Sequence, residues 1–283
     1  MKTLKNTFFL LVLLTTTASA IPAIEIEKDD KPTTAQMRDV LLNGSLRGRA
    51  EAAQRLMALA TPEAMAALFD GMADTYGAYI AADAVLQRAI QKPEGLAPLL
   101  LPGLKHKDYR TRMLTAYMLG KTGDKAASVE LSAALSDENR DVRLYSAQAL
   151  RKAGDKTAVP ALIKALSDQY GLVRLQAAAA LGVIGDASAV PELVKALGDS
   201  DAAINAARAL GKLGGSEAQT ALLAKIKAPD PAVSWAVIEA LGACSKTPAV
   251  SQQLKDLAKS TTNERTKKTC EDASTAIDGR AGK

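Results

Sequence analysis

The chain is poor in the residues that build catalytic and metal centres. Its 283 residues include one histidine, two cysteines, one tryptophan and three phenylalanines. A metal site usually needs several His, Cys or carboxylate ligands at set spacing, and we interpret the lone His106 as a turn residue. The chain also has no nucleophile elbow, zinc-protease motif or phosphate-binding loop. The sequence therefore predicts that the protein is no enzyme and binds no cofactor.

Long hydrophobic runs are equally scarce, and the one clear run lies at the N-terminus. Phe8–Leu14 follows Lys2 and Lys5 and precedes Ala18–Ala20, which is the three-part pattern of a signal peptide. Seven apolar residues cannot span a bilayer, which needs about 20. We therefore expect residues 1–20 to be a signal peptide cleaved after Ala20. The mature protein would then be periplasmic or secreted, with no membrane span.

Strong charge of one sign and strand patterns are missing too. The formal charge is only +5, without the basic concentration that nucleic-acid binding requires, so we expect no nucleic-acid partner. Only 4% of the residues are aromatic, and no convincing alternation of apolar and polar residues occurs. Long segments rich in Ala, Leu, Lys and Glu favour helix throughout.

What the chain does contain is a repeat. "LRKAGDKTAVPALIKAL" at 150–166 and "LGVIGDASAVPELVKAL" at 181–197 are nearly identical, 31 residues apart. The landmark leucines of the series are Leu119, Leu150, Leu181, Leu210 and Leu241. A period of this length is typical of stacked supersecondary units, each of which needs its neighbours to bury its apolar face.

Each unit reads as two helices. Val142, Ala147 and Leu150 form an apolar stripe at helical spacing in the first helix. Gly154 follows as a helix-ending residue. Pro160 then fits the first turn of the second helix, where its missing N–H costs little.

The segment Asp141-Val142-Arg143, followed by Gly154-Asp155 and Val159-Pro160, resembles the short HEAT-like repeat known from the phycobilin lyases. The resemblance implies an all-α, right-handed α-solenoid of about seven helical hairpins. Arg112, Arg143 and Arg174 match the arginine of the repeat's first helix, while Ala203 and Ser234 depart from it. An Asp–Arg ladder between units should therefore stop before the last two.

The organisation expected from these patterns has five parts. They are the signal peptide (1–20), a disordered leader (21–32), degenerate N-terminal helical repeats (33–107), regular HEAT-like repeats (108–260), and a C-terminal capping helix and tail (261–283). Atypical polar ends are usual in solenoids.

The candidate partner-binding residues lie on the second helices. The resemblance implies that these helices line the concave surface, and their outward positions carry Lys164, Lys195, Lys225, Lys255, Glu192 and Gln252. The lysines would form a basic row for a protein partner with an acidic surface. The alternative is a solvated helix face. Trp235 falls at an apolar packing position, and the places of Tyr145 and Tyr170 stay open.

The only cysteines, Cys244 and Cys270, are candidates for a disulfide. Two thiols in an oxidising compartment tend to pair. On parallel, level helices they would be about 9 Å apart along the axis, so a bond would need the closing helix to slide or tilt.

Three functions follow from these patterns. The favoured one is an exported, non-catalytic protein-binding scaffold that uses the concave face of a HEAT-like solenoid. One alternative is an accessory or lyase-like protein that presents a ligand, although bilin substrates lie in the cytoplasm. The other is an inhibitor or immunity-type protein acting on an exported enzyme or toxin. The iron-binding HEAT-like hydroxylases use His-Glu pairs, which this chain lacks.

Overall fold

The computed structural model describes residues 31–75 and 77–281. The predicted signal peptide, and all of the predicted leader except Lys31 and Pro32, lie outside the described residues. Across the described ranges the chain is built from α-helices and short 3₁₀ turns, without a strand. None of these helices is both long enough and apolar enough to cross a membrane.

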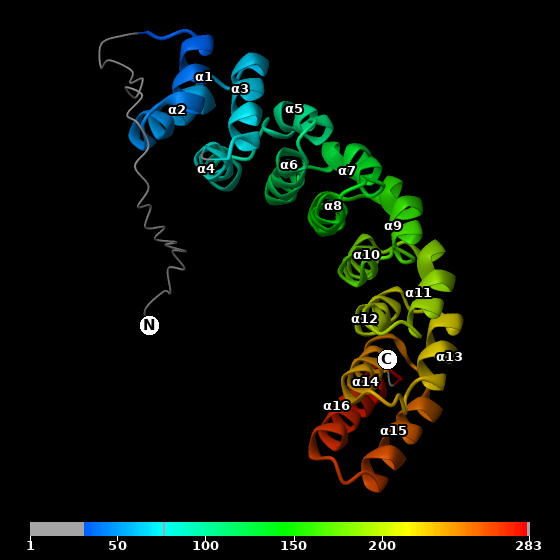
Figure 1. Ribbon diagram of the computed structural model, residues 1–283. Helices are drawn as coiled ribbons and strands as arrows, with labels where there is room; N and C mark the ends of the chain where they lie inside the picture. The colour runs from blue at the N-terminus through cyan, green and yellow to red at the C-terminus, as the bar shows by residue number, and fades with distance from the viewer. Residues whose placement is uncertain (1–30, 76, 282–283) are drawn as a thin grey trace.

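The helices form two rows along a curved array (Figure 1). The inner row, on the concave side, contains α2 (Leu46–Leu59), α4 (Ala78–Gln91), α6 (Tyr109–Thr122), α8 (Arg140–Ala153), α10 (Gly171–Ile184), α12 (Ala203–Leu213), α14 (Pro231–Cys244) and α16 (Glu264–Ala281). The outer row contains α3 (Pro62–Ala73), α5 (Ala97–Leu100), α7 (Ser128–Ala134), α9 (Val159–Ala165), α11 (Val190–Ala196), α13 (Ser216–Ala224) and α15 (Pro248–Ser260). The remaining helix, α1 (Thr34–Asn43), packs against α2 and α3 at the N-terminal end.

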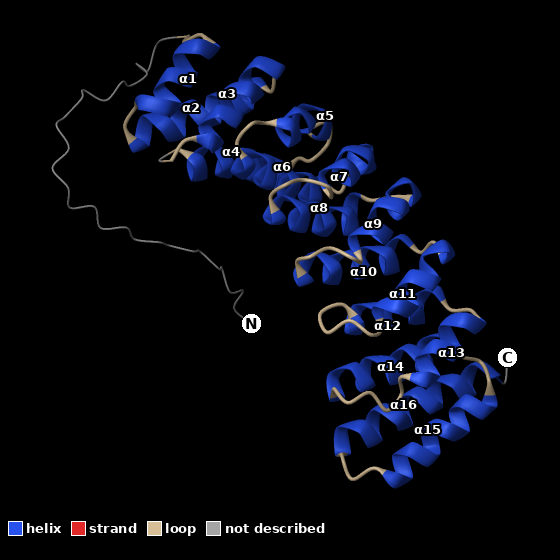
Figure 2. Cartoon of the chain, turned by 45° about the vertical axis from the view of Figure 1, so that its right-hand side comes forward, coloured by secondary structure: helices blue, strands red, loops and turns tan. Residues whose placement is uncertain are grey.

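The prediction of an α-solenoid of about seven hairpins is confirmed. Each inner helix from α2 to α14 is followed by its outer partner, from α3 to α15, with α1 and α16 as the flanking helices. Figure 2 shows the hairpins stacked along the arc with short loops between them.

Local sequence explains why each hairpin forms. In the α8–α9 unit, the Asn139 side chain accepts hydrogen bonds from the first turn of α8, and Gly154 ends that helix. The Asp155 side chain then accepts from the N–H of Thr157 in the connecting turn, and Pro160 stands in the first turn of α9. Leu150 and Leu162 are fully buried between the rows, so the predicted apolar stripes face one another.

The inner helices touch through their smallest residues. A Cβ added to Gly211 would lie 2.7 Å from the Cα of Ala240, and one added to Gly182 would lie 2.8 Å from the Cα of Ala209. The spacing between packed helices depends on the side chains at the contact. Glycine–alanine contacts therefore bring the inner helices close together, and the array curves toward this row.

This arrangement corrects one expectation. The second helices, α9, α11, α13 and α15, lie on the convex side, and the first helices line the concave side (Figure 1). Both helices of a unit carry an apolar stripe, so the stripes alone do not say which row is inside. The deciding feature is glycine directly after four of the five landmark leucines, at Gly120, Gly182, Gly211 and Gly242.

Candidate partner-binding surface

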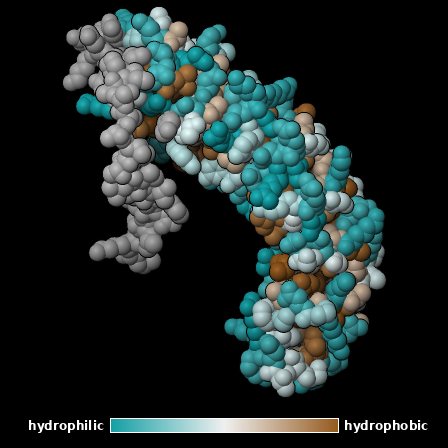
Figure 3. All heavy atoms as spheres, viewed as in Figure 1, coloured by the Kyte–Doolittle hydropathy of each residue, from teal (hydrophilic) through white to brown (hydrophobic). Residues whose placement is uncertain are grey.

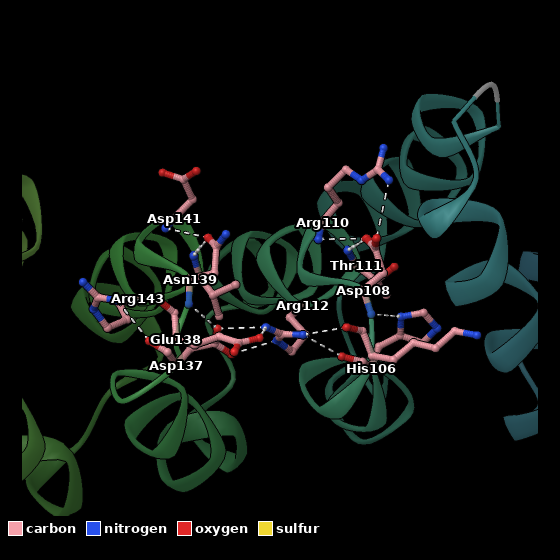
Figure 4. A network of polar contacts seen from close by, with 12 residues as sticks. His106, Asp108, Arg110, Thr111, Arg112, Asp137, Glu138, Asn139, Asp141 and Arg143 are labelled. Carbon is pink, nitrogen blue, oxygen red and sulfur yellow. Dashed lines mark hydrogen bonds and ion pairs between the residues drawn. The ribbon is translucent and has the colours of Figure 1, made fainter.

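A ladder of arginine–aspartate pairs fixes the turns between neighbouring units (Figure 4). Arg112 donates from Nε and Nη2 to the two carboxylate oxygens of Asp137, at 2.7 and 2.9 Å. Its Nη1 donates to the backbone carbonyls of His106 and Lys107. One guanidinium therefore joins the turn before its own helix to the turn that opens the next unit.

The same rung recurs one unit on. Arg143 donates to both oxygens of Asp168, with Nε 2.7 Å from Oδ2, and to the carbonyls of Asp137 and Glu138. Burial raises the pKa of Asp168. Hydrogen bonds from Arg143 and from the Tyr170 N–H outweigh burial, so the pKa lies below its ordinary value. The pair is nearly buried, with side chains 7% and 10% exposed, which makes the rung a structural contact.

The third rung is Arg174 with Asp199, where Nε lies 2.9 Å from Oδ2. Beyond it Ala203 and Ser234 occupy the arginine position, as the sequence predicted, and the Ser234 hydroxyl donates to the Ile226 carbonyl instead.

A further rung in the N-terminal repeats was missed. Arg49 bonds Asp74 at 3.0 Å and the carbonyls of Leu41 and Gly44. Its separation from Asp74 is 25 residues, the same as in the pairs Arg112–Asp137 and Arg143–Asp168, and that spacing could have revealed it.

The six residues predicted to bind a partner all lie on the outer row, so their predicted place on the concave face is wrong. The Nζ of Lys195 lies 2.6 Å from Oε1 of Glu192, and the Nζ of Lys255 lies 2.7 Å from Oδ2 of Asp278. Gln252 donates to Asp256. Lys164 and Lys225 are exposed on the convex side. The apolar pattern identifies these residues as outward-facing, but it does not show which row of helices lines the concave side. Whether these residues bind a partner stays a prediction.

The concave row has its own exposed side chains, in two adjoining recesses. The first lies between α6 and α8 and is lined by Tyr117, Lys121, Tyr145 and Lys152. The two tyrosine rings meet edge to face, with centroids 5.8 Å apart. The Lys121 ammonium lies 4.7 Å from the centre of the Tyr117 ring, within reach of a cation–π attraction. Tyr145, whose place the sequence left open, therefore belongs to the concave face.

The second recess runs from α8 to α14 and has a floor of small residues. Ala179, Gly182, Ala209 and Ala240 form this floor. Figure 3 shows apolar side chains among polar ones along the inner edge beside α10 and α12. Such a floor lets a bound chain approach the helix backbones.

The rim of the second recess is basic. Arg208 and Lys212 stand on α12, opposite the single carboxylate of Glu239 on α14. Arg151 occupies the position where four other inner helices have glycine, and its side chain lines both recesses. All three cations, with Lys121 and Lys152, are exposed, and among the described residues none of the five takes part in an ion pair.

Two other predicted positions are explained by packing. His106 lies in the turn between the 3₁₀ segment Leu101–Lys105 and α6, where its Nδ1 accepts from the Asp108 N–H at 3.1 Å. Trp235 packs between α14 and α16: its indole N–H donates to Thr266, and Arg265 stacks on its ring. Over the described part of the chain, no cluster of His, Cys, Asp and Glu is arranged to hold a metal ion.

The predicted Cys244–Cys270 disulfide is absent from the structure, where both residues are free thiols. Helices α14 and α16 are in register at a separation of 31 residues, as the Trp235–Thr266 hydrogen bond shows. Cys244 is therefore level with Thr275, five residues beyond Cys270, or about 7.5 Å along the axis. A disulfide needs Cα atoms within about 7 Å. Burial raises the pKa of Cys270 to about 11 and raises the pKa of Cys244.

Comparison with known proteins identifies the repeats. The family model of HEAT repeats matches residues 128–205 and 198–274. No curated protein sequence gives a match.

Solved structures share the architecture. The CpcE–CpcF complex of phycocyanin lyase from Nostoc sp. PCC7120 is 25% identical with a TM-score of 0.52, covering 66% of this chain and 79% of that one. An engineered protein is 22% identical with a TM-score of 0.53, covering 86% of this chain and 78% of its own. A second engineered protein is 21% identical with a TM-score of 0.50, covering 66% of this chain and 99% of its own.

Proposed function

Since the chain belongs to the HEAT-repeat proteins, we propose that it is an exported, non-catalytic scaffold that binds a partner protein in the concave face of its solenoid. The observation that carries the proposal is the inner row between α6 and α14. There a floor of glycine and alanine runs beneath exposed cations and two tyrosines.

The construction of the inner row suits binding better than catalysis. The arginine rungs and the glycine–alanine contacts hold the helices in one arrangement, so little conformational entropy is lost when a partner docks. The linings of the two recesses contain no serine, threonine, cysteine or histidine, so they hold no hydroxyl or thiol nucleophile beside a histidine base. The structural neighbour from phycocyanin lyase is itself one member of a protein complex, which supports a protein partner here.

Export rests on the N-terminal pattern of two lysines, an apolar run and small residues before Ile21. Sequencing the N-terminus of the protein from the cell envelope tests it, with Ile21 as the expected first residue. An intact Met1 on a cytoplasmic pool would contradict export.

A ligand-presenting, lyase-like function is the second candidate, because the 25% identical neighbour is part of a lyase. It predicts a small molecule that remains bound during purification. Mass spectrometry of the native protein under non-denaturing conditions separates the two candidates: an added mass in the small-molecule range favours the second.

Filling the concave recess tests partner binding. The double variant Ala179→Trp/Ala243→Trp places two large rings on the inner row, whereas Ala133→Trp/Ala161→Trp places them on the outer row. We expect the native partner, identified with the wild-type chain by affinity capture from envelope extract, to be lost with the inner variant and kept with the outer one. Equal capture by both variants would contradict the proposal.

A further inference from the structure

The two inner recesses bring together several cations and few carboxylates. Some arginines and lysines elsewhere in the repeats are paired with carboxylates, as Arg143 is with Asp168 and Lys255 with Asp278. On the inner face Lys121, Arg151, Lys152, Arg208 and Lys212 face a single carboxylate, Glu239. The two recesses therefore carry an uncompensated positive charge in a concave setting, where the field is focused on whatever enters.

These cations follow the repeat. Lys121, Lys152 and Lys212 each stand two residues after a landmark leucine, so they recur at one level on α6, α8 and α12. Arg151 stands one residue after its leucine, where glycine is the rule, and connects the two recesses. The result is a band of positive charge on α6, α8 and α12, with the apolar Val183 at the same level on α10.

The floor beneath this band selects the shape of the occupant. Glycine and alanine leave a shallow recess across α8 to α14, too open to enclose a small anion but suited to a chain lying over it. At about 9 Å between neighbouring helices, the span from α6 to α12 is about 27 Å, which about eight residues of extended polypeptide cover.

From this juxtaposition we infer that the concave band Lys121–Arg151–Lys152–Arg208–Lys212 binds an acidic, extended segment of the partner protein, with aspartates or glutamates opposite the cations. The inference rests on the proposed function and specifies the chemistry of its partner. The Tyr117–Tyr145 pair at the α6–α8 end gives the segment an apolar surface and two phenolic hydroxyls.

A labelled peptide of ten glutamates tests the inference, with a peptide of ten glutamines as the uncharged control. We expect the full chain to bind the glutamate peptide in a fluorescence-anisotropy titration, more weakly as salt rises, and not to bind the glutamine peptide. The variant Arg208→Glu/Lys212→Glu should weaken binding about tenfold, because two exposed attractions become repulsions.

The matched control is Lys164→Glu/Lys225→Glu, which changes net charge equally on the outer row. It should alter binding by less than about twofold, since those lysines face away from the band. The neutral variant Arg208→Gln/Lys212→Gln should fall between wild type and the reversed variant, with an unchanged helical melting curve. Equal weakening by the inner and outer reversals would overturn the inference, because net charge alone would then explain the binding.

Two other occupants are distinguished in the same titrations. Tighter binding of a ten-nucleotide oligothymidylate than of the glutamate peptide would overturn the inference in favour of nucleic acid. A salt-sensitive dimer in sedimentation, abolished by the inner reversal, would overturn it in favour of a second copy of this chain.

Failure of this inference can be told from failure of the proposed function. If Ala179→Trp/Ala243→Trp loses the native partner while Arg208→Glu/Lys212→Glu keeps it, the concave face binds a partner that is not acidic. If neither variant loses the partner, the proposed function itself fails.

Discussion

Two parts of the solenoid keep their neighbours in register by different means. From α6 to α11, three arginines join successive turns through Asp137, Asp168 and Asp199, and two of them, Arg112 and Arg143, are buried. From α12 onward Ala203 and Ser234 replace the arginines. Glycine–alanine contacts occur in both parts, from Gly120–Ala149 to Gly242–Ala273, and are interrupted at α8, where Arg151 stands in place of glycine. The close contact of inner helices is therefore the common element of the stack, and the arginine ladder is an additional set of contacts that stops before α12.

The end of the second part is closed by a different set of contacts. Trp235 bonds Thr266 and carries the stacked Arg265, while Arg280 donates to the carbonyls of Gly242 and Ser245 at the end of α14. An arginine still binds turn carbonyls here, but it comes from the closing helix. The last unit thus satisfies its exposed carbonyls without a following repeat.

Removing a rung should give the largest effect in the first part. Arg143→Ala removes the guanidinium that donates to the nearly buried Asp168 and to two turn carbonyls, so we expect a loss of about 3 kcal/mol in unfolding free energy. Urea unfolding followed by circular dichroism measures it. Lys156→Ala is the control, because Lys156 is 79% exposed and 4.0 Å from Asp186, and it should cost less than about 0.5 kcal/mol. Similar losses in both variants would remove the distinction between rung and surface pair.

Adding one methyl group to the inner row should destabilise both parts. Gly120→Ala and Gly211→Ala each force a Cβ to within 3 Å of the next helix's Cα, which should cost about 1–3 kcal/mol despite alanine's better helix propensity. Gly198→Ala lies in an outer turn, where the Cβ meets only the Lys195 carbonyl at 3.4 Å, and it should be nearly neutral. Thermal melting of the three variants checks the order, which a stable Gly211→Ala would contradict.

Acid should weaken the first part before the second. The pKa values of Asp168 and Asp199 lie below the ordinary value: burial raises each, but hydrogen bonds outweigh it. A lowered folded-state pKa stabilises the fold above the unfolded value of about 3.9, and this contribution is lost as pH falls through the folded-state pKa. We expect amide exchange in α8 and α10 to accelerate below about pH 4 ahead of α14. Asp168→Asn should flatten this response, and an unchanged profile in that variant would contradict the assignment.

The cysteines should give the smallest effect. Both thiols are expected to be free when counted in denaturant without reductant, and Cys270 to react slowly in the folded protein because it is buried with a raised pKa. One thiol-reactive reagent, used with and without denaturant, measures both. A count of zero free thiols would mean that the disulfide forms, and therefore that α16 slides about 7.5 Å from the register set by Trp235 and Thr266.

The sequence predicts the units well because their packing is local and periodic. The recurrence of Leu150 as Leu181, and the pairing of Arg143 with Asp168 of the next turn, follow directly from stacking similar hairpins. The direction of curvature depends on which row of helices has the smaller side chains at its helix–helix contacts, and an apolar stripe does not reveal that. Glycines such as Gly211 do reveal it, once they are recognised as contact residues within a helix and not as helix ends.

The candidate surface was missed for the same reason. Arg208 and Lys212 occupy ordinary solvent positions of a first helix, and their significance comes from lying on the concave side without an ion pair in the described structure. Arg151 carried a signal in the sequence, since it interrupts the series Gly120, Gly182, Gly211 and Gly242.

The most direct test of partner binding on the concave face is site-specific photo-crosslinking in the native cell. A photoreactive residue at Ala179 lies in the inner recess, and one at Ala161 lies on the outer row. We predict a discrete adduct with one protein from position 179 and none from position 161. An adduct from position 161 with none from position 179 would contradict the account.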